Sequence, residues 1–234
     1  MKIPNSGLFI AVLVMLSWAR LLLYALFEHD LSFTTTPLLL LVIIHLYTGL
    51  FITAHDSIHG SVSTVPIINY WVGKLCLLSF AGFDYDMIRE EHWNHHIHAG
   101  IQGQDPDFHR GKTEFTHWIF EFMKQYMSLA QVCRLLVIVG TLWVCGAPLF
   151  RLFLFMAVAG LSSALVLFYY GTYLPHRPDE GAQDLNRPEK FRTLDPEKDS
   201  RLTSFLKAYN FGCHSEHHAN PRIPWWALYD AHLS

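Results

Sequence analysis

The sequence predicts an all-α integral membrane protein with four transmembrane helices and a cytoplasmic cap. Two observations of composition carry this prediction. Apolar residue types make up 51% of the 234 residues, and charged residues make up only 16%, against about 25% in an ordinary soluble domain. The chain also contains several apolar runs with few charges, each close to the length of about 20 residues that a membrane-spanning helix needs. A third observation, the presence of fifteen histidines, bears on function.

Composition also excludes several classes of protein. A disordered or collagen-like chain would be far less apolar. The formal net charge is −3, which does not favour nucleic acid or another polyanion as a partner. The four cysteines stand far apart without C-x-x-C spacing, so they predict neither a disulfide framework nor an iron–sulfur site.

Apolar runs place the predicted spans along the chain. Each run is read as one helix because it carries at most one charged residue inside it. A further stretch, 66–83, is interrupted by Lys74 and is expected to lie at the membrane interface. The four predicted spans cover about residues 7–27, 37–59, 131–147 and 149–174.

Basic residues in the connections predict the orientation. Residues 60–134 and 175–234 together hold fourteen of the seventeen lysines and arginines. Loops rich in lysine and arginine stay on the cytoplasmic side. We therefore expect residues 84–130 and 175–234 to form one cytoplasmic cap on an inner (cytoplasmic) membrane, and residues 1–234 to form a single domain.

Histidines cluster in four places, all expected at the cytoplasmic side. One motif is H-x-x-x-H at the end of the second span, two are H-x-x-H-H in the cap, and a single histidine ends the last span. Offsets of three and four residues put the rings on one face of a helix. The candidate ligands are His55, His59, His92, His95, His96, His176, His214, His217 and His218.

Nine histidines exceed the needs of a single metal ion. A structural zinc site closes with four ligands, whereas nine imidazoles suit two ions with four or five ligands each. Imidazole binds iron, copper and zinc. Zinc has no redox chemistry and could not activate oxygen, whereas a di-iron centre could. A membrane protein that binds metal without catalysis is the alternative.

Other polar residues are assigned by position. Carboxylates beside the motifs are candidates to orient the ligands, because a ligating imidazole usually donates its second N–H to an acceptor; solvated surface acids are the alternative. These carboxylates are Asp56, Asp105, Asp107 and Glu216.

Histidines outside the motifs are not expected to bind the metal. His45 lies about 15 Å from His55 along one helix and is expected to be packed in the bundle, whereas the role of His98 stays open. His109, His117 and His232 have no partner at ligand spacing and are expected at the surface or interface.

The motifs resemble those of the membrane fatty-acid desaturase superfamily of histidine-ligated di-iron enzymes. The match is closer to the bacterial-type β-carotene 4-ketolases within it. The stretches that carry it are 54–62 (AHDSIHGSV), 92–108 (HWNHHIHAGIQGQDPDF), 171–178 (GTYLPHRP) and 211–226 (FGCHSEHHANPRIPWW). One departure is Ser215, since many relatives have a second consecutive histidine at this position. The H-x-x-H-H spacing of His214, His217 and His218 is kept.

The resemblance implies a function and its partners. It implies an O2-dependent oxygenase with two Fe²⁺ ions that places a keto group at C4 of β-ionone rings, taking β-carotene through echinenone to canthaxanthin. Two successive hydroxylations and a dehydration would form the ketone. A carotenoid 3-hydroxylase and a lipid acyl desaturase use the same motifs and stay open as alternatives. The chain as given has no G-x-G-x-x-G unit and no cysteine quartet, so electrons are expected from a separate ferredoxin and its reductase.

Aromatic residues near the site are candidates to line a path for a rigid polyene. They are Phe80, Phe83, Tyr169 and Tyr170. For Trp225 and Trp226, anchoring at the membrane interface is the more favoured interpretation.

Overall fold

The computed structural model describes residues 6–28, 31–177 and 199–233. The described chain contains helices and no strand, which confirms the all-α prediction. It divides into two compact units. The first unit comprises Met1–Asp84 and Ser128–Ala164, and the second comprises Tyr85–Met127 and Leu165–Ser234. Residues 178–198, part of the predicted cap, lie outside the described residues.

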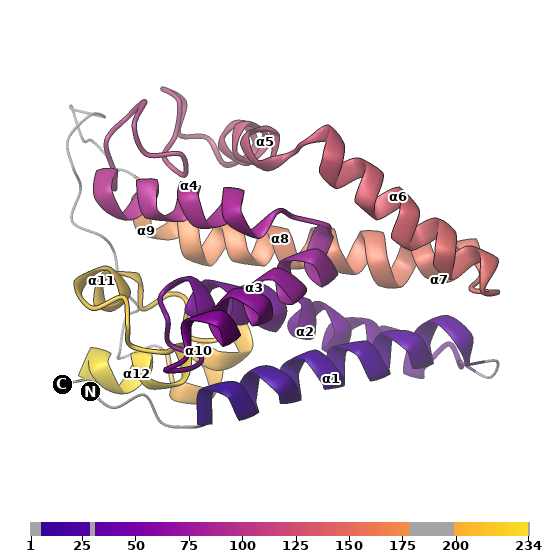
Figure 1. Cartoon of the computed structure of the whole chain (residues 1–234). Helices are drawn as coiled ribbons and strands as arrows, with labels where there is room; N and C mark the ends of the chain where they lie inside the picture. The colour runs from indigo at the N-terminus through magenta and orange to yellow at the C-terminus, as the bar shows by residue number, and fades with distance from the viewer. Residues whose placement is uncertain (1–5, 29–30, 178–198, 234) are drawn as a thin grey trace. The chain divides into compact units, whose positions relative to one another are not determined.

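Three helices are long and apolar enough to cross a membrane. They are α1 (Ser6–Phe27), α2 (Thr35–Ile58) and the continuous helical stretch Leu149–His176. These helices match the spans expected over 7–27, 37–59 and 149–174 within a few residues (Figure 1). The last stretch contains α7 (Leu149–Leu152), η1 (Phe153–Val158), α8 (Ala159–Leu167), η2 (Phe168–Tyr173) and α9 (Leu174–His176).

The span expected over 131–147 is a shorter helix. It is α6 (Leu129–Val144), which has 16 residues and at 1.5 Å per residue is shorter than a bilayer core of about 30 Å. The segment 66–83 contains α3 (Pro66–Ala81). Two pairs of helices are each joined by a sharp bend: α3 with α4 (Tyr85–His98), and α5 (Phe115–Tyr126) with α6. If each bent pair counts as one span, the described chain holds up to five spans. The count of four therefore stays a prediction.

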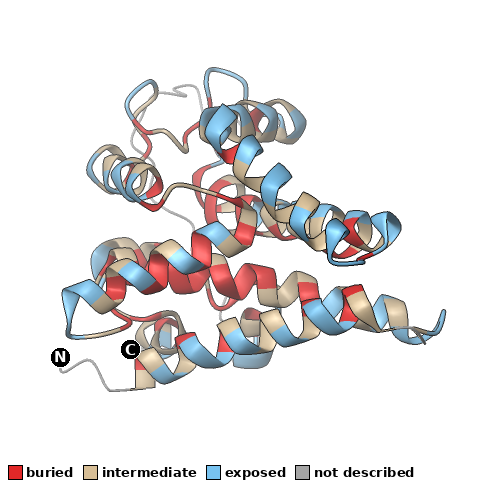
Figure 2. Cartoon of the chain, turned by 45° about the vertical axis from the view of Figure 1, so that its right-hand side comes forward, coloured by how far each residue is buried: buried red, intermediate tan, exposed pale blue. Residues whose placement is uncertain are grey.

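In the first unit, α2 packs against both α1 and α3 (Figure 1). The ring of Trp18 on α1 meets that of Tyr47 on α2 edge to face, with 5.5 Å between centroids. Deeper in, the hydroxyls of Thr48 and Ser163 lie 2.9 Å apart and join α2 to α8; hydroxyl pairs of this kind hold apolar helices in register. Buried residues gather in the second half of α2, from Tyr47 to Ser57 (Figure 2).

A capping box fixes the start of α6. The Ser128 hydroxyl accepts a hydrogen bond from the Gln131 backbone, and the Gln131 side chain accepts one from the Ser128 backbone. The Gln131 amide also donates to the carbonyl of Ala81, 3.0 Å away, at the end of α3. There Gly82 has φ +68° and a built Cβ would lie 3.2 Å from the Gln131 carbonyl, so glycine suits this turn for both reasons.

The second unit comprises α4, α5, the end of α8, η2, α9 and three short C-terminal helices, α10 (Arg201–Ala208), α11 (His214–Ala219) and α12 (Trp225–Leu233). Two small cores stabilise it by burying apolar surface. One core consists of Phe108, Trp118 and Phe168. The other consists of Cys213, Leu228 and Tyr229.

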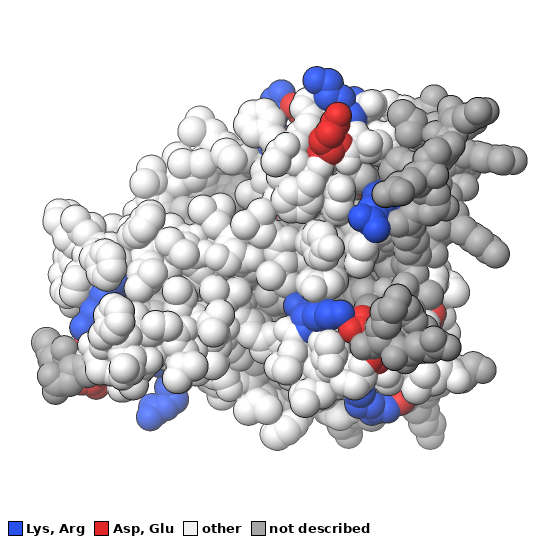
Figure 3. Space-filling view, turned by 180° about the vertical axis from the view of Figure 1, so that it is seen from behind, with Lys and Arg blue, Asp and Glu red and all other residues white. Residues whose placement is uncertain are grey.

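Much of the surface is uncharged and apolar. The face in Figure 3 shows wide areas without lysine, arginine, aspartate or glutamate. Exposed apolar side chains on the long helices include Phe9, Leu16, Leu38 and Leu161. Such a surface fits a lipid environment, since a monomeric soluble protein rarely exposes large apolar patches.

Candidate metal centre

In the first unit, α2 ends on the H-x-x-x-H motif. The rings of His55 and His59 stand 4.9 Å apart between centroids, and both side chains are buried. Gly60, with φ +70°, ends the helix directly after them. The Asp56 carboxylate lies 3.6 Å from His55 Nδ1, which is beyond a hydrogen bond. The role expected for Asp56 therefore stays a prediction.

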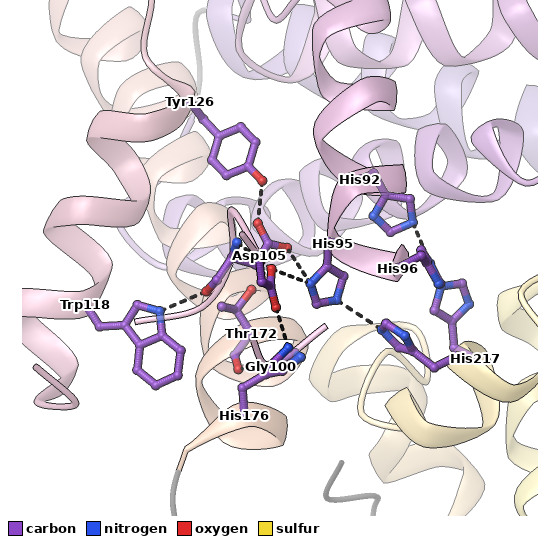
Figure 4. Close-up of polar contacts among 12 residues, drawn as sticks. His92, His95, His96, Gly100, Asp105, Trp118, Tyr126, Thr172, His176 and His217 are labelled. Carbon is purple, nitrogen blue, oxygen red and sulfur yellow. Dashed lines mark hydrogen bonds and ion pairs between the residues drawn. The ribbon is translucent and has the colours of Figure 1, made fainter. Parts of the chain in front are cut away.

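In the second unit, α4 carries the first H-x-x-H-H motif on one stripe. Ring nitrogens of different histidines come close together here: His96 Nε2 lies 3.1 Å from His92 Nε2 and 3.0 Å from His217 Nε2 of α11 (Figure 4). The same helix also carries four charged residues, Asp86, Arg89, Glu90 and Glu91, and its placement in a cytoplasmic cap stays a prediction.

Four histidines of the second unit converge on one point. Each offers one ring nitrogen, and the four nitrogens all lie within 4.8 Å of one another. Two of them, His95 Nε2 and His218 Nε2, are 3.0 Å apart. A metal–nitrogen bond of about 2.1 Å puts neighbouring ligand atoms about 3 Å apart, so the set fits one transition-metal ion. The four residues are His95, His176, His214 and His218.

The Asp105 carboxylate fixes the orientation of His95. A carboxylate only accepts hydrogen bonds, so His95 Nδ1 donates to Asp105 Oδ1 over 2.8 Å. This tautomer leaves Nε2 with a lone pair for a metal. Asp105 also accepts from the backbone N–H groups of Gly100, at 2.8 Å, and Asp107, at 2.9 Å. Burial is the largest single influence and opposes the charge on both partners, but hydrogen bonds and the attraction of neighbouring charges together outweigh it, so the pKa of His95 is raised and that of Asp105 is lowered.

Asp107 lies further from His95 than Asp105 does. Its Oδ2 is 3.9 Å from His95 Nδ1, and its Oδ1 accepts a hydrogen bond from the Tyr126 hydroxyl (Figure 4). Its backbone carbonyl accepts from Trp118 Nε1 at 2.9 Å. Burial raises the pKa of the Asp107 carboxyl to about 6. The loop after α4 is thus tied to α5 at two points.

His176 is oriented by the last span itself. Its Nδ1 donates to the Thr172 carbonyl over 2.8 Å, which again leaves Nε2 for a metal. The preceding turns, Phe168–Tyr173, are π-helical. Pro175 has no N–H to continue the α-helical pattern, and π-helical turns of this kind often occur at functional sites.

A close contact beside this turn was missed by sequence reasoning. A Cβ built on Gly171 would lie 2.0 Å from Cε1 of Phe211, so only glycine admits the ring. The Phe211 ring in turn lies 6.3 Å from that of His214. No spacing rule links residues 40 positions apart, so the sequence carried no signal for this contact.

Two of the histidines expected at the surface or interface have side chains packed inside the second unit, so that expectation was wrong for them. The side chain of His232 is only 7% exposed, and its Nδ1 lies 2.7 Å from Glu216 Oε1. His109 is 1% exposed and packs between the rings of Phe108 and Trp118. His117, the third histidine expected at the surface or interface, is half-buried. His98 is half-buried and is not part of the four-histidine set.

The aromatic candidates occupy two places. In the first unit, Phe80 is 6% exposed and stacks on Phe83 with 6.0 Å between centroids. In the second unit, Tyr169 and Tyr170 meet edge to face at 5.0 Å. Trp225 stacks on Phe205 at 5.7 Å. A role in substrate binding stays a prediction for Phe80, Phe83, Tyr169 and Tyr170, as does interfacial anchoring for Trp225.

Comparison with known proteins gives the class. The model of the family described as "Fatty acid desaturase" matches residues 31–136 and 121–233. The chain therefore belongs to the fatty acid desaturase family. Within that family it is similar to proteins named as carotenoid ketolases. It is 40% identical over 235 residues to a "Zeaxanthin 4-ketolase" of Chlamydomonas reinhardtii, covering 95% of this chain and 52% of that protein.

Two further relatives bear related names. A "Beta-carotene ketolase" of Haematococcus lacustris is 42% identical over 189 residues, covering 80% of this chain and 59% of the relative. A "Beta-carotene ketolase" of Paracoccus sp. (strain PC1) is 35% identical over 235 residues, covering 97% and 91%. The chain thus spans about half to three fifths of the algal relatives and most of the bacterial one.

Proposed function

We propose that this protein is a membrane-bound, O2-dependent carotenoid 4-ketolase. The observation that supports this most is the convergence of His95, His176, His214 and His218 within 4.8 Å, in a chain whose relatives are named as ketolases. Four imidazoles without a cysteine suit a redox-active first-row metal. Forming a ketone at an allylic ring carbon requires a redox cofactor, because no amino-acid side chain oxidises a C–H bond, and such a metal can serve as that cofactor.

All nine motif histidines are proposed to bind two iron ions. The four converging histidines hold one ion. The second ion takes its ligands from the remaining five: His55, His59, His92, His96 and His217. Support for this second set comes from the i, i+3 and i, i+4 spacing of the motifs and from the closeness of His92, His96 and His217 within the second unit.

Burial prepares these imidazoles for metal binding. Burial, assisted by the charge of His95, lowers the pKa of His96 to about 4. Burial and the neighbouring histidines likewise hold the pKa of His214 well below its usual value. Both rings are therefore neutral near pH 7, and only a neutral imidazole has a lone pair for the metal.

The chain's own residues have distinct tasks. Asp105 and the Thr172 carbonyl hold the Nδ1 protons of His95 and His176, which keeps both Nε2 atoms directed to one point. Tyr126 and Trp118 hold the loop that carries Asp105 and Asp107. When bound, the two irons supply activation of O2 for C–H oxidation.

The proposed reaction converts one ring methylene to a ketone. Each hydroxylation uses one O2, two electrons and two protons, inserts one oxygen atom into a C–H bond at C4 and releases one water. A second hydroxylation at the same carbon gives a gem-diol, which loses water to leave the ketone. The electrons are proposed to come from reduced ferredoxin. β-Carotene and its 3-hydroxylated derivatives are the proposed substrates, and the aromatic residues Phe80, Phe83, Tyr169 and Tyr170 are proposed to contact them.

The four-span layout in a single domain belongs to the same proposal, with the histidines on the cytoplasmic side. The distribution of lysine and arginine between the connections supports that orientation. Ferredoxin is a soluble protein, so it would reach the site from this side.

The test is pigment analysis in a bacterial host that makes β-carotene, with a parallel host that makes zeaxanthin. Chromatography and mass spectrometry should find a product that gains one oxygen and loses two hydrogens per modified ring. Oxygen gained without hydrogen loss would identify a hydroxylase. Unchanged carotenoids together with new double bonds in membrane lipids would identify an acyl desaturase. The His218→Ala protein, expressed at the same level, serves as the inactive control.

A further inference from the structure

We infer that His232 is a positioning residue for the metal centre, acting through Glu216. This inference rests on the proposed metal centre and extends it to a residue outside the histidine motifs. It starts from one contact: His232 Nδ1, near the end of α12, donates to Glu216 Oε1 of α11 over 2.7 Å. The two side chains are 7% and 17% exposed, so water screens this pair little.

Glu216 stands between the proposed ligands of α11. This helix has only six residues, His214–Ala219, too few for a helix to be stable by itself. Its position must therefore come from outside contacts. Three proposed ligands, His214, His217 and His218, depend on that position.

Two contacts join α11 to α12. Cys213, directly before α11, is fully buried in a core with Leu228 and Tyr229. Leu228 and His232 are four residues apart and so share a helical face. The apolar contact fixes the start of α11, and the hydrogen bond from His232 fixes its middle.

Further contacts anchor α12 itself. The Tyr229 hydroxyl donates to the Asp199 carbonyl at 2.7 Å, and Arg201 pairs with Asp230. Asn210 Nδ2 donates to the Trp225 carbonyl at 3.0 Å. Because these contacts hold α12 in place, the hydrogen bond from His232 also holds the Glu216 side chain in place. It also keeps the Glu216 carboxylate occupied, so this oxygen ligand does not compete for the metal.

The experiment titrates metal-free, full-length protein in detergent with Co²⁺ and records the visible absorption of the bound ion. Three variants are compared with the unaltered protein: His232→Ala, His232→Gln and Leu233→Ala. Glutamine retains an N–H donor for Glu216. Leu233 is the neighbour of His232 on α12 and is 60% exposed, so it is the matched control. The melting temperature of each metal-free protein is measured in parallel.

We expect His232→Ala to weaken Co²⁺ binding about tenfold and to alter the absorption spectrum, while the metal-free melting temperature falls by no more than the loss of one buried hydrogen bond explains. His232→Gln should recover most of the affinity, and Leu233→Ala should behave like the unaltered protein. Equal affinity and equal spectra for His232→Ala would overturn the inference and leave the metal centre intact. A loss that glutamine does not repair, accompanied by a lower metal-free melting temperature, would also overturn it. If His232→Ala does not fold, Glu216→Ala takes its place, because it removes the acceptor of the same hydrogen bond. Glu216→Ala should then weaken Co²⁺ binding and His232→Gln should not, and equal affinity for the two variants would overturn the inference. Absence of Co²⁺ binding by the unaltered protein would overturn the metal centre and the inference together.

Discussion

His95 and Asp105 form the central polar contact of the second unit. His95 Nδ1 lies 2.8 Å from Asp105 Oδ1, and both side chains are almost fully buried. Since the carboxylate holds the Nδ1 proton, Nε2 is the only nitrogen of His95 that can bind a metal. One carboxylate ten residues away thus decides how the first H-x-x-H-H motif presents a ligand.

Replacing Asp105 should therefore weaken metal binding without removing any ligand. We expect Asp105→Ala to lower the affinity for Fe²⁺ by about 10- to 100-fold, as is typical for loss of a partner that orients a ligating histidine. Metal per chain after equilibration with buffered Fe²⁺ gives the measurement. Glu90→Gln, an exposed change on α4, is the control. Undiminished iron in the Asp105 variant would contradict the role assigned to this carboxylate.

The proposed ligands should differ sharply from histidines elsewhere. We expect His214→Ala to abolish the ketone product, because it removes one of four converging ligands. His45→Ala should keep the activity, since His45 lies too far along α2 from the motif. Product yield per unit of expressed protein is the measurement. A fully active His214→Ala protein would contradict the ligand assignment.

The stability of the metal-free protein should depend on pH in a defined direction. Burial lowers the folded-state pKa of His96 to about 4 and holds the pKa of His214 well below the ordinary histidine value of 6.5. Between these values the unfolded chain binds more protons than the folded one, so the free energy of unfolding should fall as the pH falls from 6.5 toward 4. His95, with a raised pKa, acts in the opposite sense only above pH 6.5. Asp107 acts in the opposite sense within the interval, because burial raises its pKa to about 6 and the folded chain then binds its proton first; this one group only partly offsets the loss from the two histidines.

Thermal unfolding of chelator-treated protein across this pH interval tests the expectation. His96→Gln, which cannot titrate, should reduce the slope. Protein loaded with metal should have a higher melting temperature throughout the interval but should lose more of it on acidification, because protons compete with the ion for the ring nitrogens. A metal-free melting temperature that is constant or rises on acidification would contradict the assignment.

Gly171 offers a test of packing beside the site. A methyl group there would overlap the Phe211 ring, so Gly171→Ala should destabilise the protein by about 1–3 kcal/mol, as overpacking usually does. Gly160→Ala is the matched control on the same helical stretch, because a Cβ built there meets nothing within 4 Å. Denaturant or thermal unfolding measures both. A second change, Phe211→Leu, should restore part of the loss at Gly171, and its failure to do so would place the strain elsewhere.

The sequence alone determined the helical class, three long apolar helices and the histidine motifs. Each of these features is local: an apolar run sets the length of a helix, and spacings of three and four residues set which rings share a face. The pairing of His95 with Asp105 was also within reach, since the two lie in one short stretch. The number of spans was not, because α6 is shorter than its apolar run: the chain turns at Cys145 and Gly146 before the run ends.

Only the tertiary structure decided which residues meet over long sequence distances. His95 and His218 are separated by 123 positions, yet their Nε2 atoms lie 3.0 Å apart. The contacts of Phe211 with Gly171 and of His232 with Glu216 likewise follow no spacing rule. His109 and His232 have no motif around them, so their burial could not be foreseen. Spacing along a helix fixes the direction of a side chain, but its partners are set by how helices pack, and packing depends on the shapes of all side chains together.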